Sequence, residues 1–326
     1  MTNLNMAKAL NAALRSSLAD DPKVLLMGED IGTLGGVFRV SDGLAKEFGA
    51  HRVIDTPISE SAIVGTAIGL ALRGYRPVCE IQFDGFVYPA FDQIVAHLAK
   101  LRGRSGGRLR VPVTIRIPFG GGIKAIEHHS ESNEAYFAHT AGLRVVVCSS
   151  PGSAYDMLRA AIASDDPVIF YEPKRLYWDK EEVDLAHAPL ASVLDAAVVL
   201  RAGTDATIVT YGPTTRVALA AANIAQQEGR SLEVIDLRSL SPIDIDLVNA
   251  SVRKTGRAVV LHEAPTFLGL GAEVAAQISH DCFYSLQAPV QRVGGYNLPY
   301  PHSGVEDEYL PDVDRLLDAV DRTFEE

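Results

Sequence analysis

The sequence predicts an α/β fold with two domains, each built on a parallel β-sheet. The chain has 326 residues, which is long for one average domain and comfortable for two that each bury a core. Hydrophobic residues make up 47% of it and aromatic residues only 7%, a usage typical of proteins with buried parallel strands. Strand-like apolar runs alternate with helical segments along the whole chain, which favours parallel strands joined by crossover helices.

The first half of the chain contains strand-like runs at 24–29, 77–83, 111–117, 143–149 and 167–173. Helical patterns lie at 59–73, 91–101 and 153–163, and the N-terminus has the spacing of an amphipathic helix. The helix IVGTAIGLALRG is apolar nearly all round, so we expect it to be buried. Its glycines, Gly65 and Gly69, would let another backbone approach closely.

A charged, proline-bearing stretch without sustained periodicity separates the two halves. It predicts a linker at 181–204 between a first domain at 1–180 and a second domain at 205–326. Strand-like runs recur in the second half at 205–212, 231–238, 257–263 and 290–295, with helical patterns between and after them. The second domain is therefore expected to be α/β as well.

The charge and the cysteines argue against several classes of function. A formal net charge of −11 disfavours a nucleic-acid partner or an anionic membrane surface. Cys79, Cys148 and Cys282 are odd in number and far apart, so neither a disulfide framework nor a metal-binding spacing is predicted. No apolar run approaches a membrane span, and the N-terminus lacks the pattern of a signal peptide. We therefore expect a cytoplasmic protein.

Glu60 stands between a proline turn and the apolar helix, in the stretch DTPISESAIVG. One explanation is that an acid in the first turn interacts favourably with the helix dipole. The other is a carboxylate in a dry environment that exchanges a proton with a cofactor ring. The apolar, glycine-bearing neighbourhood favours the second interpretation.

Aromatic and imidazole side chains gather in two further segments. Phe83 and Phe86 belong to an aromatic group at a strand-to-helix turn, where ligands bind in open α/β sheets, although core packing explains most such groups. His128 and His129 lie on a polar loop, where an imidazole is suited to proton transfer. A metal pair is not predicted, because the two histidines are adjacent and point in different directions.

The glycine-rich stretches 32–38 and 119–124 are the candidates for phosphate binding. Neither has the spacing of a dinucleotide fingerprint or of a P-loop. Glycine frees the backbone for turns, so both are expected to be flexible loops.

Taken together, the motifs resemble a known family. They include MGEDIG, DTPISESAIVGTAIGLALRGYRPVCEIQF, PAFDQIVAHLAK, HHSESNEAYFAHTAGLRVVV and RSLSPIDIDLVNASVRKTGRAVVLHEAP. In this order the chain resembles, over essentially its whole length, the β subunit of the thiamine-dependent decarboxylase component of 2-oxo acid dehydrogenase complexes. The resemblance implies a transketolase-like pyrimidine-binding domain, then a transketolase C-terminal domain, in an α2β2 heterotetramer.

The resemblance also implies roles for individual residues. Glu60 would hydrogen-bond the aminopyrimidine ring of thiamine diphosphate, and Phe86 would pack against that ring. Gln82 is a further candidate for cofactor binding. His129 would transfer protons in the steps that lead to lipoyl acylation, with the neighbouring His128 as the alternative.

The partner subunits and ions follow from the same resemblance. The α subunit would hold the diphosphate and the magnesium ion, so this chain is expected to be inactive alone. A lipoyl acyltransferase would receive the acyl group from the 2-oxo acid. Oxygens of two segments would bind a potassium ion; their residues are Val111, Val113, Thr114, Ala161, Ser164 and Asp166.

The main substrate is predicted from two segments. SESNEAYFAHTAGLRVV and YEPKRLYW look more like branched-chain members than pyruvate members, so we expect a 3-methyl-2-oxobutanoate dehydrogenase β subunit. A pyruvate dehydrogenase β subunit is the close alternative. A non-catalytic scaffold subunit is the alternative from another class, and the presence of Glu60, Phe86 and His129 together speaks against it.

Overall fold

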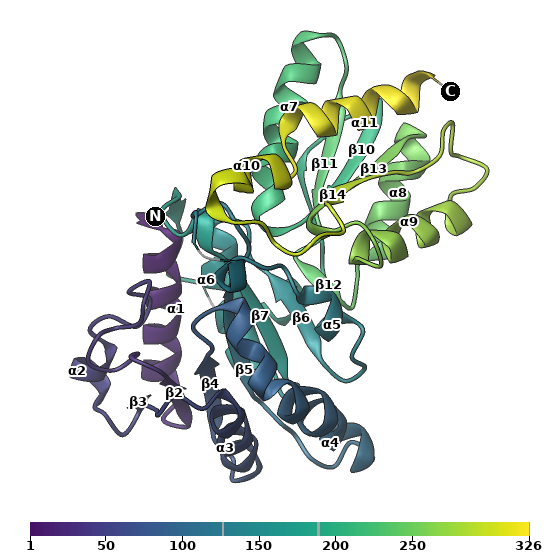
Figure 1. The fold of residues 1–326 in the computed structure, drawn as a ribbon. Helices are drawn as coiled ribbons and strands as arrows, with labels where there is room; N and C mark the ends of the chain where they lie inside the picture. Colours follow the sequence, from purple (N-terminus) through teal and green to yellow (C-terminus); the bar gives the residue numbers. More distant parts are fainter. Residues whose placement is uncertain (126, 188–189, 326) are drawn as a thin grey trace.

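The computed structural model describes residues 1–125, 127–187 and 190–325 and shows two α/β domains stacked on each other (Figure 1). The first sheet has the order β12 (Ser239–Ser241), β6 (Arg144–Val147), β7 (Val168–Pro173), β5 (Thr114–Phe119), β4 (Arg76–Glu80), β2 (Val24–Gly28) and β3 (Val53–Asp55). The second has the order β14 (Gln291–Gly295), β13 (Ala258–Pro265), β10 (Ala206–Thr210), β11 (Leu232–Asp236) and β9 (Val198–Arg201). The predicted fold class is confirmed.

Helices cover both faces of the first sheet, because successive residues of a strand point to opposite faces and both sets are apolar. One face packs against α1 (Met6–Asp20) and α6 (Pro151–Ala163). The other packs against α3 (Glu60–Leu72), a π-helical turn η2 (Gln93–Leu98) and α4 (Ala99–Arg104). Shorter helices are α2 (Leu44–Phe48), α5 (Glu134–Ala138) and the 3₁₀ helices η1 (Asp84–Ala90) and η3 (Glu127–His129).

The second sheet is covered in the same way. Its outer face packs against α7 (Thr215–Gln227) and α11 (Val313–Glu325). Its inner face packs against α8 (Ile245–Thr255) and α9 (Leu270–Asp281) and continues into the core of the first domain. The short helix α10 (Glu306–Tyr309) and the 3₁₀ helix η7 (Ser303–Val305) precede α11, while the 3₁₀ helix η6 (Gly212–Thr214) precedes α7.

The antiparallel strand pairs were not predicted. Strand β12 comes from the second half of the chain and pairs with β6 of the first sheet. Strand β9 lies inside the predicted linker and pairs with β11 of the second sheet. Strands β1 (Thr2–Asn5) and β8 (Lys180–Val183) form a separate pair. Short strands at a sheet edge carry little hydrophobic pattern, so the sequence signal for them is weak.

Helix α3 is less buried than its composition predicts. Within this chain its buried residues are Ile63, Val64, Ala67 and Ala71. Gly69 lies on the exposed side, where a Cβ atom would meet no other atom within 4 Å. The expectation of burial all round is wrong for the single chain, because no described element of the chain covers this outer side.

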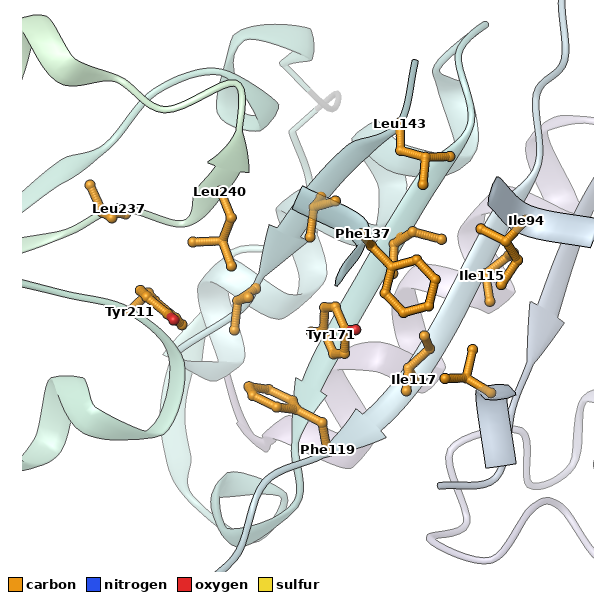
Figure 2. Close-up of a cluster of buried hydrophobic side chains, with 14 of the residues drawn as sticks. Ile94, Ile115, Ile117, Phe119, Phe137, Leu143, Tyr171, Tyr211, Leu237 and Leu240 are labelled. Carbon is orange, nitrogen blue, oxygen red and sulfur yellow. The ribbon is translucent and has the colours of Figure 1, made fainter. Parts of the chain in front are cut away.

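One hydrophobic cluster runs through both domains (Figure 2). Ile115, Ile117 and Tyr171 stand on β5 and β7 of the first sheet, with Tyr211 and Leu240 of the second half beside them. Burial of a shared apolar surface is the main favourable term in folding. The two domains are therefore packed against each other through a common core.

A buried ion-pair cluster crosses three adjacent strands of the first sheet. Arg116 on β5 donates to Glu80 on β4 at 2.6 Å and to both carboxylate oxygens of Glu172 on β7, at 2.6 and 2.8 Å. The Tyr177 hydroxyl donates to Glu172 at 2.8 Å. Burial raises the pKa of Glu80, and the charge of Arg116 opposes that rise. The guanidinium therefore compensates two carboxylates that water cannot reach.

We expect Arg116→Met to destabilise the chain by about 3–5 kcal/mol, because it leaves buried carboxylates without a counter-charge. Urea unfolding measures the change. Arg102→Met is the matched control, since it removes only a partly exposed pair with Asp166 and should cost about 1 kcal/mol or less. Equal effects of the two substitutions would contradict the assignment.

Candidate active site

Two carboxylates meet where α3 begins. Glu60 occupies the first turn of α3 and is half-buried, and Glu29, directly after β2, is 7% exposed. Burial raises the pKa of Glu29, the negative charge of Glu60 raises it further, and a hydrogen bond from the Ser59 backbone opposes the rise. One carboxylate oxygen of Glu29, Oε1, is buried without a partner among the described residues. A buried, unpartnered oxygen next to a second acid is suited to receive a donor from a bound molecule.

Gln82 lies beside this acid pair. Its Nε2 donates to the main-chain oxygen of Glu29 at 3.4 Å. The contact arises because β2 and β4 are parallel neighbours, so the residues that follow them meet at the same edge of the sheet. This edge is where open α/β sheets bind ligands.

An aromatic group surrounds His129. The ring centroids of Phe83 and His129 are 4.4 Å apart, and those of Phe86 and His129 are 5.0 Å apart. His128 is exposed, whereas His129 is half-buried with its Nδ1 unpartnered among the described residues. Burial lowers the pKa of His129, and the neighbouring His128 and Lys174 lower it further. His129, rather than His128, is therefore the imidazole that this aromatic group encloses.

The glycine-rich segment 119–124 is held by the second domain. The Gly121 N–H donates to Glu263 at 2.5 Å, and the N–H groups of Gly122 and Lys124 donate to Glu306 at 3.0 and 2.9 Å. A Cβ atom at Gly121 would lie 1.7 Å from the hydroxyl oxygen of Tyr300. The expectation of a flexible loop is not met, because carboxylates of the second domain satisfy its backbone donors.

A cavity of about 190 Å³ lies where residues 131–136 of the first domain meet residues 263–265 and 298–300 of the second. Residues of both domains line it, among them Tyr88, Glu131, Tyr136, Glu263 and Tyr300. The Tyr88 hydroxyl donates to Glu131 at 2.8 Å. This crevice between the domains therefore lies beside the loop that carries His129.

The predicted potassium ligands come from two segments that lie side by side. The Val111 N–H donates to the Asp165 oxygen at 3.1 Å, and the Val168 N–H donates to the Val113 oxygen at 2.9 Å. The Ser164 oxygen accepts from Arg76 at 2.9 Å. No cluster of metal-binding side chains is found in the described parts of the chain. The main-chain oxygens of Val113 and Ser164 thus already accept protein hydrogen bonds. The potassium site stays a prediction.

A second buried polar cluster joins the domains behind the site. Tyr211 of the second domain donates to Glu134 Oε1 at 2.6 Å, and Glu134 Oε2 is buried without a partner among the described residues. Burial raises the pKa of Glu134 to about 7, and the bond from Tyr211 opposes the rise. His262 stacks on Tyr211 with 6.0 Å between ring centroids, and burial lowers the pKa of His262 to about 4.

Comparisons with known proteins agree with this geometry. "Transketolase, pyrimidine binding domain" matches residues 2–179, and "Transketolase, C-terminal domain" matches residues 195–316. A Leifsonia xyli subsp. xyli protein named "Pyruvate dehydrogenase E1 component subunit beta" is 60% identical over 99% of this chain and 95% of its own length. A Mycobacterium tuberculosis protein named "3-methyl-2-oxobutanoate dehydrogenase subunit beta" is 55% identical over 99% of this chain and 92% of its own length.

A solved structure shares the fold. It is described as "Split gene transketolase, inactive beta4 tetramer", with a TM-score of 0.78, 23% identity, and coverage of 98% of this chain and 99% of that chain. The chain therefore belongs to the family of transketolase-like β subunits of the thiamine-dependent decarboxylase component of 2-oxo acid dehydrogenases. The predicted family and enzyme class are confirmed, while relatives with similar identity carry two different substrate names.

The gathered residues fit the aminopyrimidine part of thiamine diphosphate. Glu29 Oε1 and His129 Nδ1 are buried polar atoms that lack a protein partner. A ring that carries both donors and acceptors would satisfy such atoms. Phe86, packed against the core at its edge, offers an aromatic surface beside them.

Sequence reasoning missed Glu29 as a site residue. It directly follows the first long strand of the sheet, as Gln82 follows the neighbouring strand. The strand order, which places these two strands side by side, is what reveals the pair. Glu263 and Asp236 lie buried between the domains of one chain, where they bind Gly121 and Ser149 of the first domain.

We expect Glu134→Gln to change how stability depends on pH. The folded pKa of Glu134, about 7, exceeds the ordinary 4.5, so the folded wild type binds more protons and loses stability as pH rises through this range. Glutamine cannot ionise, so the variant should gain about 2–3 kcal/mol relative to the wild type between pH 5 and pH 8.

Urea unfolding at the two pH values measures this gain. Glu228→Gln, at an exposed residue, is the control and should follow the wild-type profile. Parallel pH profiles for Glu134→Gln and the wild type would show that the raised pKa is wrong.

Proposed function

We propose that this chain is the β subunit of a branched-chain 2-oxo acid dehydrogenase, acting on 3-methyl-2-oxobutanoate and related acids. The observation that supports this proposal is a contact beside the site between residues 130–146 and residues 171–178, the two segments that resemble branched-chain members. Tyr171 donates to Asn133 at 2.7 Å, and Lys174 donates to the main-chain oxygen of His129, directly before the first segment. Relatives named for branched-chain acids in Mycobacterium tuberculosis and Pseudomonas aeruginosa, 55% and 44% identical, support this substrate class.

Each site residue has a proposed role. Glu60 binds the aminopyrimidine ring and shares a proton with it, since an ionised carboxylate makes a strong, directional hydrogen bond to a ring N–H. Phe86 packs against the ring, and Gln82 helps to orient it through its contact with the Glu29 backbone. His129 moves protons during acyl transfer to lipoamide. When bound, thiamine diphosphate supplies a nucleophilic carbon and an electron sink for the decarboxylation.

The rest of the complex is proposed as follows. An α subunit pairs with this chain in an α2β2 heterotetramer and holds the diphosphate and the magnesium ion, and a lipoyl acyltransferase accepts the acyl group. The glycine-rich segment 119–124 supports this division, because its backbone donors bind carboxylates rather than facing a phosphate. The described part of the chain has no helix able to cross a membrane. We propose a cytoplasmic complex.

A pyruvate dehydrogenase β subunit is the second candidate. It is favoured by the Leifsonia xyli relative, which is 60% identical and carries that name. A non-catalytic scaffold is not favoured, because Glu29 Oε1 and His129 Nδ1 are buried without a partner among the described residues, which suits a bound ligand.

The first experiment compares substrates. The chain is copurified with its natural α subunit, and thiamine-dependent reduction of an artificial electron acceptor is measured with 3-methyl-2-oxobutanoate and with pyruvate. A preference of about tenfold or more in kcat/KM for the branched acid is expected, since added methyl groups in an apolar pocket discriminate by this order. A preference for pyruvate would make the chain a pyruvate dehydrogenase β subunit instead. Activity with neither acid would favour the non-catalytic scaffold.

We expect Glu60→Gln to leave the complex assembled and to lower kcat by about 100-fold or more, because proton exchange with the ring is lost. Steady-state kinetics and size-exclusion chromatography measure the two effects. Glu273→Gln is the matched control, because Glu273 also lies in the first turn of a helix but is exposed. Equal, small effects would show that Glu60 serves only the helix dipole.

A further inference from the structure

Lys174 is buried beside the His129 loop, and the proposed chemistry does not use it. Its side chain is 0% exposed, and its Nζ lies 2.5 Å from Oδ1 of Asp84, whose side chain is also 0% exposed. Burial lowers the pKa of Lys174, while the carboxylate of Asp84 opposes that change. A buried ion pair contributes little to stability compared with well-packed apolar residues. Its place in the site therefore calls for another explanation.

Lys174 and Asp84 hold the His129 loop through three hydrogen bonds. The Lys174 ammonium donates to the main-chain oxygen of His129. The second carboxylate oxygen of Asp84 accepts from the Glu131 N–H at 2.7 Å, and the Asp84 main-chain oxygen accepts from Asn133 Nδ2 at 3.0 Å. These contacts fix the chain from the histidine to Asn133, since each bond has a preferred direction.

The loop also sits directly on the turn that follows Asp84. A Cβ atom at Gly85 would lie 2.2 Å from the main-chain oxygen of His128, a distance that no side chain tolerates. Phe83, on the other side of Asp84, places its ring 4.4 Å from the ring of His129 and 5.5 Å from Lys174 Nζ. Residues 83–85 and Lys174 thus form a seat for the histidine loop.

We propose that Lys174 and Asp84 are positioning residues that hold His129 in its working orientation. Neither touches the substrate or the cofactor in this assignment; both act through the backbone of 129–133. The inference rests on the proposed proton-transfer role of His129. It deepens that role by naming what fixes the imidazole, because a misplaced catalytic group loses rate without any change in its chemistry.

The direct test measures loop order by amide hydrogen exchange of the assembled complex with the α subunit. In Lys174→Met, peptides that cover 127–133 should exchange about tenfold faster or more, because the His129 oxygen loses its donor and Asp84, the acceptor of the Glu131 N–H, loses the ammonium that fixes it. Gly103→Ala is the control, since a Cβ atom there meets nothing within 4 Å, and its exchange should match the wild type. Unchanged protection of 127–133 in Lys174→Met would overturn the proposal.

Gly85→Ala provides a second route to the same answer if Lys174→Met folds poorly. It displaces the loop through the His128 oxygen while leaving the ion pair in place. The same increase in exchange, confined to the loop, is expected. Wild-type protection in this variant would overturn the proposed seat.

A kinetic readout separates positioning from simple destabilisation. The rate with the lipoyl domain as acceptor is divided by the rate with an artificial acceptor. His129→Ala should lower this ratio, and Lys174→Met and Gly85→Ala should lower it about fivefold or more in the same direction. A lowered ratio for His129→Ala alone would overturn the positioning role. An unchanged ratio for His129→Ala would refute the proposed function of His129, while the exchange experiment would still decide whether Lys174 orders the loop.

Discussion

Charges buried at the carboxyl edge of the first sheet need partners, and the rest of the site depends on this constraint. Arg116 stands between Glu80 and Glu172 on three neighbouring strands, and Lys174 meets Asp84 just beyond the ends of two of them. A buried ion without a partner costs several kcal/mol. The strands and the loops that follow them are therefore fixed relative to one another, which gives the candidate site its walls.

The second domain contributes contacts that hold the loops of the site in place. Glu263 and Glu306 bind backbone donors of the glycine-rich segment, and Tyr211 binds Glu134 next to the histidine loop. The apolar core continues from one sheet to the other beneath these contacts (Figure 2). Because polar contacts at the edge and apolar packing below act together, the loops of the first domain gain order from the second.

The chain presents groups that suit one part of the cofactor but not its phosphates, which fits a site shared with a second polypeptide. It presents acids, an aromatic wall and an imidazole, which suit a nitrogen-containing ring. Its glycine-rich segment is occupied by carboxylates, and the outer side of α3 leaves apolar surface uncovered. A second polypeptide that carries the phosphate-binding elements and covers this helix accounts for both features in the proposed complex.

The sequence by itself determined the α/β class and most strands and helices, because hydrophobic periodicity is local. Its resemblance to the family pointed to Glu60, Gln82, Phe86 and His129 as candidate site residues. The antiparallel edge strands, Glu29 and the Lys174–Asp84 pair emerged only from the tertiary structure. Strand order and loop seating depend on contacts between residues far apart in the chain, and no local pattern encodes them. For the same reason the sequence leaves His128 as an alternative to His129, and the structure separates the two by burying His129 against Phe83 while His128 stays exposed.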